Sequence, residues 1–182
     1  MSGPGPAVCF PLGYGQRGEE TTVRWRGRDY ATIPFELEVP GISPSGGQEP
    51  LPERVMILRD RALGRRLRDV VSRSEADALL TILTARDEVI LADPDTEIDG
   101  RRSPNWVHYH CTRLLMGGSP EAVARLIRLS GVGSPELERT DMHTLSRFAA
   151  VTLGELVHVL AVPRTTLLAR LVASGGRVWS HV

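Results

Sequence analysis

Trp106 begins the stretch of this 182-residue chain whose residue types best suit a binding role. It follows Arg101 and Arg102, and the segment that starts at Pro104 has the features of a helix N-terminus. An apolar ring flanked by guanidinium groups can enter a base step of DNA while the cations contact phosphates. Trp106 could instead fill the core of a helical bundle. Residue type alone leaves both interpretations open.

The turn after Trp106 carries two histidines and a cysteine, which are common metal ligands. On a helix, His108 and His110 point to different sides, so they do not easily share an ion. No further ligands follow at zinc-like spacings, and the sequence therefore predicts no metal site. It also contains no Ser-His-Asp signature, phosphate-binding glycine loop or carboxylate pair. We expect a protein that is not an enzyme and needs no cofactor.

Composition narrows the class of protein. The formal net charge is zero, so bulk electrostatics alone would not hold the chain on nucleic acid. All 22 cationic side chains are Arg, whose forked guanidinium can still make local contacts with phosphate or carboxylate. Two cysteines are too few for a disulfide framework, and no apolar run approaches the roughly 20 residues that cross a bilayer. The first ten residues do not resemble a signal peptide, so we expect a cytoplasmic protein without membrane contact.

The first 60 residues are predicted to form short strands bounded by Gly or Pro, over residues 7–10, 21–25, 33–39 and 55–58. Residues 13–15 are expected to form a turn, and residues 26–29 the tip of a hairpin. These features indicate a small curled barrel of the SH3 or Tudor type, which usually binds a partner along an edge strand or between loops. Arg24, Arg26 and Arg28 are therefore candidate binding residues, although a merely solvated hairpin has the same composition.

Helical patterns dominate the rest of the chain. Residues 74–77 form a capping-box-like start for a helix that we expect to link the barrel to the remainder. Further helices are predicted from residue 104 and over residues 122–129, 141–150, 153–160 and 164–172. Five such helices joined by short loops indicate a compact bundle. The predicted fold is α+β, with a barrel over residues 1–72, a linking helix and linker over 73–103, and a helical bundle over 104–182.

Two stretches are similar to nucleic-acid-binding motifs. Residues 129–134 are similar to the hairpin of a helix-hairpin-helix motif, but the residues that follow lack the pattern of its second helix. Residues 153–171 resemble a helix-turn-helix, with Ala161 where glycine is usual. Any antiparallel helix pair has similar spacing. A self-standing helix-turn-helix repressor is therefore kept as an alternative, and it would read DNA with Arg164, Thr165 and Thr166.

Taken in order, these segments resemble the CarD family of bacterial transcription factors. The segments that carry the resemblance are residues 8–15 (VCFPLGYG), 35–41 (FELEVPG), 55–58 (VMIL), 70–71, 74–83, Asn105-Trp106, 122–129 and 145–156. Each segment is unspecific alone, whereas their ordered series is fairly specific. The resemblance covers most of residues 7–172.

The resemblance implies a regulator of transcription initiation. In that family a Tudor-like N-terminal domain binds the β subunit of RNA polymerase. A helical domain contacts promoter DNA at the upstream edge of the melted bubble, where its tryptophan enters the minor groove and stabilises the open complex. Trp106 would have that role here. We expect Arg101, Arg102 and Arg113 to contact phosphates, in a monomer that binds promoter DNA without sequence specificity.

The turn after Trp106 departs from the family's pattern. Where the family has several basic residues, this chain has His108 and His110, with Arg113 as the cation. Fewer phosphate contacts predict weaker DNA binding, and histidines add charge only below about pH 6.5. We therefore expect polymerase binding to be stronger than DNA binding. On exposure and charge we assign the polymerase contact to the hairpin arginines Arg24, Arg26 and Arg28. A polymerase-binding module without DNA contact is a further alternative.

Overall fold

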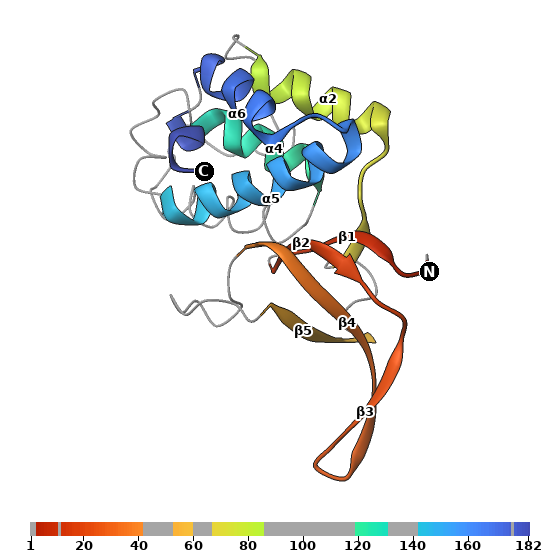
Figure 1. Ribbon diagram of the computed structural model, residues 1–182. Helices are drawn as coiled ribbons and strands as arrows, with labels where there is room; N and C mark the ends of the chain where they lie inside the picture. The colour runs from red at the N-terminus through yellow and green to blue at the C-terminus, as the bar shows by residue number, and fades with distance from the viewer. Residues whose placement is uncertain are drawn as a thin grey trace, which may run out of the picture.

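The computed structural model describes residues 3–10, 12–41, 53–59, 67–85, 119–130, 142–175 and 177–182. Strands come first in the chain and helices follow, so the predicted α+β class is confirmed. The strands form a curled antiparallel half-barrel, and the helices lie together against one end of it (Figure 1). The β3–β4 hairpin projects from the opposite end.

The longest strand organises the sheet. The six strands are β1 (Gly5–Cys9), β2 (Gly13–Arg17), β3 (Thr21–Trp25), β4 (Arg28–Pro40), β5 (Arg54–Leu58) and β6 (Leu67–Asp69). Strand β4 has β2 and β3 along one edge and β5 along the other, because Thr32 pairs with both Thr21 and Leu58. Strand β1 joins β2 to β6. All neighbouring strands are antiparallel.

All four predicted strands are present, and the structure adds two more: β2 between β1 and β3 in the chain, and β6 after β5. The turn predicted over residues 13–15 is wrong, because these residues belong to β2. A side chain at Gly15 would collide with the carbonyl oxygen of Glu36, so this glycine permits close strand packing instead of a turn. The sequence did not predict strand β6, which lies in an arginine-rich segment. It forms because Ala7, Val8 and Cys9 pair with it across a long sequence separation.

Four α-helices and a short 3₁₀ helix are present among the described residues. They are α2 (Arg73–Thr84), α4 (Pro120–Ser130), α5 (Met142–Leu160), α6 (Arg164–Ala173) and η2 (Arg177–His181). The helices predicted over residues 122–129 and 164–172 are confirmed with small changes at their ends. The helix predicted from residue 104 lies outside the described residues. Helix α2, predicted as a linking helix, packs against α4 and α5.

Helix α2 begins two residues earlier than the sequence predicted. Ser72, not Ser74, is its N-cap: the Ser72 hydroxyl oxygen accepts a hydrogen bond from the Glu75 backbone N–H at 3.3 Å. The Glu75 carboxylate accepts one from the Ser72 backbone N–H at 2.7 Å, which completes a capping box. The Ser72 hydroxyl also donates to the Glu75 carboxylate at 2.7 Å, and this hydrogen bond, together with the one from the Ser72 backbone N–H, lowers the pKa of Glu75.

Helix α5 is continuous, although the sequence predicted two helices with a break before residue 153. Residues 152–155 match a capping box, yet the helix runs through them. Gly154 lies where α5 crosses the sheet. A Cβ atom there would lie 2.8 Å from Val39 Cγ2 and 3.3 Å from Tyr14 Cδ1. The glycine thus serves close packing of helix on sheet and does not end the helix.

Sheet and helices share a hydrophobic core. Val8, Phe10 and Tyr14 are buried in the same cluster as the inward side chains of α2, α4 and α5. The ring of Phe10 stacks on that of Phe148, with centroids 4.6 Å apart. A second, smaller cluster within the sheet consists of Ala7, Cys9, Ile33, Phe35 and Ile57. No helix within the described part of the chain is long and apolar enough to span a membrane.

Candidate functional site

Strands β3 and β4 form the hairpin that the sequence predicted, with its tip at Arg26 and Gly27. Every residue of β3 is exposed, and the hairpin extends well beyond the rest of the sheet (Figure 1). Arg26 and Gly27 make the connection with φ angles of 49° and 77°. Two successive positive φ angles are typical of the type I′ turn, whose twist matches that of the flanking strands. The hairpin therefore has a defined end rather than a loose loop.

The three predicted arginines do not share one face of the hairpin. Arg24 is paired with Asp29, and their charged groups are 3.9 Å apart. Trp25 and Arg28 form the next pair, so their side chains project from the opposite face. The Arg26 guanidinium lies over the Trp25 ring, 4.5 Å from its centroid, in a cation–π contact. The structure thus groups Arg26 and Arg28 with Trp25, whereas Arg24 faces the other way.

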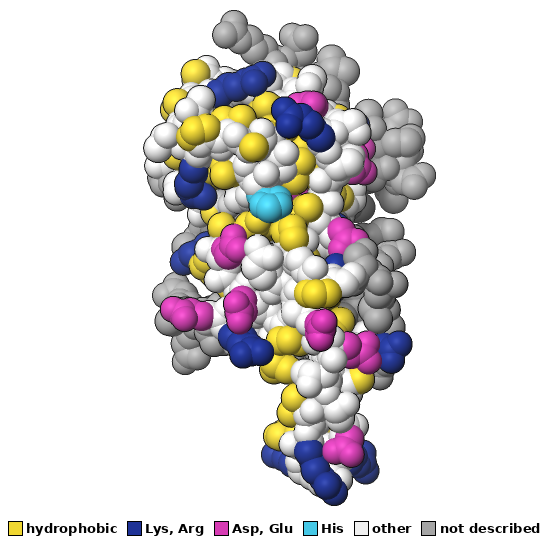
Figure 2. Space-filling view, turned by 45° about the vertical axis from the view of Figure 1, so that its right-hand side comes forward, with side chains coloured by type: hydrophobic (Ala, Val, Ile, Leu, Met, Phe, Trp, Pro, Cys, Tyr) yellow, Lys and Arg dark blue, Asp and Glu magenta, His cyan; other side chains and the backbone are white. Residues whose placement is uncertain are grey.

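The face that carries Trp25 is apolar along much of its length. Val23 is paired with Tyr30, and Pro34 with Met56. Since alternate residues of a strand share a face, these side chains lie on the same side as Trp25. We call Val23, Trp25, Tyr30 and Met56 the apolar strip. Figure 2 shows hydrophobic side chains in a line along one side of the hairpin, which ends in arginines.

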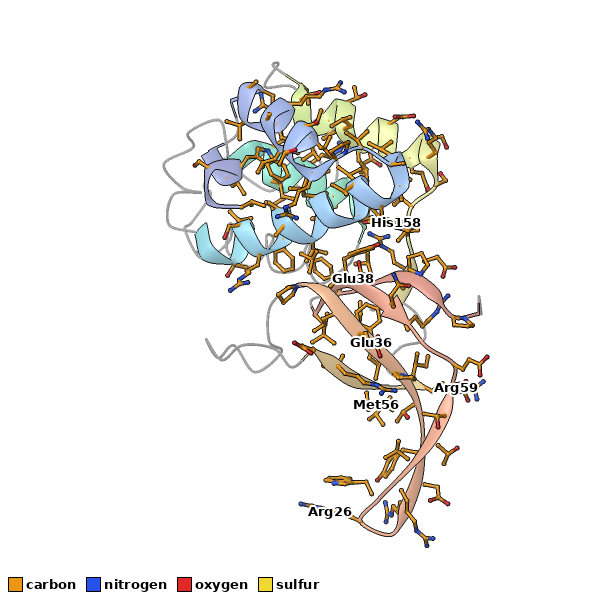
Figure 3. The ribbon with its side chains drawn as sticks, in the orientation of Figure 1. Arg26, Glu36, Glu38, Met56, Arg59 and His158 are labelled. Carbon is orange, nitrogen blue, oxygen red and sulfur yellow. The ribbon has the colours of Figure 1, made fainter. Side chains whose placement is uncertain are left out.

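Exposure distinguishes the apolar strip from the rest of the described surface. Among the described residues, three of the four large hydrophobic side chains that are exposed belong to it: Val23 at 38%, Trp25 at 57% and Met56 at 43%. The rings of Trp25 and Tyr30 meet edge to face, with centroids 6.3 Å apart. Figure 3 labels Arg26 at the tip and Met56 on β5, at the two ends of the strip.

Sequence reasoning missed the apolar strip. It singled out the hairpin for its arginines and treated Trp25 only as the end of a strand. The alternation of Val23, Arg24 and Trp25 does predict that the two apolar residues share a face. It could not predict that Met56 joins them, because that depends on how β5 pairs with β4.

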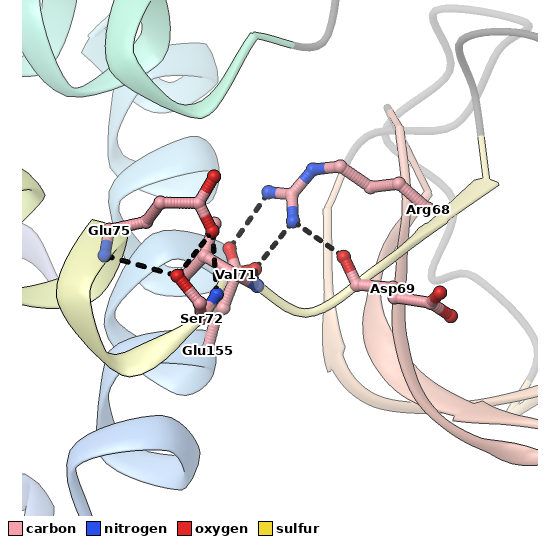
Figure 4. Close-up of polar contacts among 6 residues, drawn as sticks. All are labelled: Arg68, Asp69, Val71, Ser72, Glu75 and Glu155. Atoms are coloured by element: carbon pink, nitrogen blue, oxygen red, sulfur yellow. Dashed lines mark hydrogen bonds and ion pairs between the residues drawn. The ribbon is translucent and has the colours of Figure 1, made fainter.

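Arg68 and Glu155 connect the sheet to the helices (Figure 4). The Glu155 carboxylate, on α5, is 2% exposed and accepts hydrogen bonds from both terminal nitrogens of Arg68 on β6, at 2.5 and 2.9 Å. It also accepts one from the Val71 backbone N–H at 2.9 Å. The buried charge is therefore paired and hydrogen-bonded, as a stable buried carboxylate must be.

Tyr14 lies at the same junction of sheet and helices. Its ring is buried, 6.0 Å from the ring of His158 on α5. Burial raises the pKa of Tyr14 to about 12, and the negative charges of Glu38 and Glu155 add to this effect. Figure 3 shows Glu38 and His158 close to where α5 meets β4. The phenol is therefore held neutral over a wide range of pH.

The turn between α5 and α6 has one feature of a helix-turn-helix. Ala161 has a φ of 54°, the conformation for which glycine is usual in that motif. Leu167 and Leu171 are buried. The three residues predicted to read DNA in this alternative, Arg164, Thr165 and Thr166, are exposed in the first turn of α6.

The predicted DNA contacts lie outside the described residues. They are Trp106, Arg101, Arg102, Arg113, His108 and His110. The helix-hairpin-helix-like stretch over residues 131–134 also lies there. In the part of the chain that the structure describes, no group of three or more His, Cys, Asp or Glu side chains could hold a metal ion. DNA contact by Trp106 stays a prediction from the sequence.

Comparison with known proteins adds no family assignment. No protein-family model matches the chain, and no curated protein matches it.

Proposed function

We propose that the protein is a CarD-like regulator of transcription initiation, without enzymatic activity, that binds the β subunit of RNA polymerase. The projecting β3–β4 hairpin carries the proposal. It is exposed along β3, and its end presents Arg26 and Arg28 beside an exposed Trp25. Arg and Trp are enriched where proteins bind one another. The curled antiparallel sheet supports the proposal, because it is the element that the CarD resemblance leads one to expect.

The proposal assigns promoter contact to the helical part of the chain. Trp106 would enter the minor groove at the upstream edge of the bubble, with Arg101, Arg102 and Arg113 on the phosphates. Sequence specificity is not required, because polymerase fixes where the protein meets the promoter. The shared core supports this arrangement, since a sheet held on polymerase carries the packed helices with it.

A pull-down with the tagged full-length chain tests polymerase binding. The full chain is needed because a fragment of residues 1–72 would expose Val8, Phe10 and Tyr14, which the helices cover. We expect the β subunit of RNA polymerase to be retained. Replacing Arg26 and Arg28 by Glu should reduce retention, because the cationic end of the hairpin becomes anionic. Absence of the β subunit from the wild-type eluate would contradict the proposal.

Trp106→Ala tests the DNA contact separately. We expect this variant to bind polymerase as the wild type does and to shorten the lifetime of the promoter open complex. An unchanged lifetime with intact polymerase binding would instead favour the polymerase-binding module without DNA contact.

A self-standing helix-turn-helix repressor is the second candidate. The positive φ of Ala161 at the α5–α6 turn favours it, together with the exposed Arg164, Thr165 and Thr166. This candidate predicts a dimer that binds a palindromic operator in the absence of polymerase. The CarD-like proposal predicts a monomer that protects no DNA unless polymerase is present.

A further inference from the structure

The apolar strip supports a more specific inference, which rests on the proposed polymerase contact. We propose that the strip of Val23, Trp25, Tyr30 and Met56 is the centre of the docking surface and that Trp25 is its anchor. The partner surface on polymerase would be a protein surface with an aliphatic depression for the indole, bordered by carboxylates that meet Arg26 and Arg28. Arg26 and Arg28 would then form the rim of the interface and not its centre.

Composition and exposure favour a protein partner. Trp, Tyr, Met and Arg are enriched at protein interfaces, and Trp, Tyr and Arg dominate their binding energy. The strip and the adjacent turn contain each of these residue types. Val23 and Met56 are 38% and 43% exposed, and phosphates would leave such aliphatic surface in water. A nucleic acid would use the arginines but not the aliphatic part of the strip.

Trp25 is held in position before any partner binds. Arg26 covers one part of the indole at 4.5 Å, and the Tyr30 ring meets it edge to face at 6.3 Å. The turn that follows has two positive φ angles and is only two residues long. A side chain that is already ordered loses less entropy on binding, which strengthens the contact. Trp25 still presents 57% of its surface to solvent.

Charge complementarity identifies the rim of the partner surface. Arg28 is paired with Trp25 and lies on the same face, whereas Asp29 is paired with Arg24 and lies on the opposite face. The end of the strip near the turn is therefore cationic on the docking side. Carboxylates beside the aliphatic depression would complete this end of the interface.

Binding of purified bacterial RNA polymerase core enzyme to the immobilised full-length chain tests the inference by biolayer interferometry. We expect Trp25→Ala to raise the Kd at least about tenfold, as loss of an interface anchor does. Met56→Ala should raise the Kd about threefold. Val172→Ala is the matched control. Val172 is an exposed hydrophobic side chain of similar exposure, at 47%, but it lies on α6 and outside the strip, so we expect a change of no more than about twofold.

Three further readouts make each outcome decisive. Far-UV circular dichroism should be the same for all variants, because each replaced side chain is exposed, and Trp25→Phe should retain more affinity than Trp25→Ala. Wild-type binding that Trp25→Ala leaves unchanged would overturn this inference and leave the proposed function standing. No binding by the wild type would overturn both. If Trp25→Ala weakened binding to a fluorescent promoter duplex without polymerase and left polymerase binding intact, the hairpin would be a nucleic-acid contact and the inference would be wrong.

Discussion

Glu155 shows how one side chain can join two parts of a fold at the scale of the residue. It is on α5, yet its carboxylate is bound by Arg68 and by the backbone of Val71, which belong to the segment leaving the sheet. A carboxylate that is 2% exposed is stable only while those partners remain. The sequence suggested a helix cap for this residue. Its partners are more than 80 positions away, so no local pattern could reveal them.

Glu155→Ala should lower the free energy of unfolding by about 3 kcal/mol, because it leaves Arg68 and the Val71 N–H without their partner in a largely buried place. Urea unfolding measures the change. Glu121→Ala is the control, since it breaks the exposed pair of Glu121 with Arg125 and should cost no more than about 0.5 kcal/mol. Equal losses in the two variants would contradict a structural role for the buried pair.

Tyr14 predicts a dependence of stability on pH in the alkaline range. Its pKa is raised from 10.0 to about 12 in the folded protein, mainly by burial. The folded state therefore keeps a proton that the unfolded state releases. The resulting stability is fully present below pH 10.0 and is lost as the pH rises towards about 12. Tyr14→Phe should remove this part of the alkaline decline in the urea midpoint. Tyr30→Phe, on the exposed hairpin, should leave the decline in place.

At the scale of the element, the sequence predicted the bounds of strands and helices well where interactions between neighbouring residues determine them. Strand β3 has the predicted bounds because alternating residues end at a two-residue turn. Helix α6 begins after Pro163, as expected. Local sequence failed at Gly154 and in β2, where glycines allow backbones and side chains to approach closely. From the sequence alone, residues 152–155 could either start a helix as a capping box or place Gly154 against another element. Only the packing of α5 on the sheet distinguishes the two.

Gly154→Ala tests this explanation of α5. In an exposed helix the change would stabilise by about 1 kcal/mol. Here the new Cβ would lie 2.8 Å from Val39 Cγ2, and we expect a net destabilisation of about 1 kcal/mol from overpacking. Thermal unfolding measures the sign. The double variant with Val39→Ala should regain most of the loss, because it removes the methyl group that the alanine meets. A stabilising Gly154→Ala would contradict close packing at this crossing.

At the scale of the whole molecule, the net charge is zero, but charged and apolar side chains are unevenly distributed over the surface. The projecting hairpin ends in arginines beside an apolar strip, and the opposite end of the molecule is a helical layer joined to the sheet by a common core. Composition could predict neither the strip nor the common core, because both depend on contacts between distant segments. The arginines of the hairpin could be predicted, and their division between two faces could not.

The shared core also determines how the two proposed contacts cooperate. The sheet that carries the hairpin and the described helices belong to one packed body, connected by the Phe10–Phe148 stack and the Arg68–Glu155 pair. Affinity for polymerase can then substitute for affinity for DNA, because a tethered contact has a high effective concentration. The weak DNA binding that the sequence predicts from the few cations after Trp106 would then suffice.

Footprinting of a promoter fragment with the full-length protein alone, with polymerase alone and with both tests the central claim most directly. The account predicts no protection by the protein alone. With polymerase bound, it predicts added protection at the upstream edge of the melted bubble, which Trp106→Ala reduces. Protection of a palindromic site by the protein alone, abolished by Arg164→Ala and unaffected by polymerase, would contradict the account and identify a helix-turn-helix repressor.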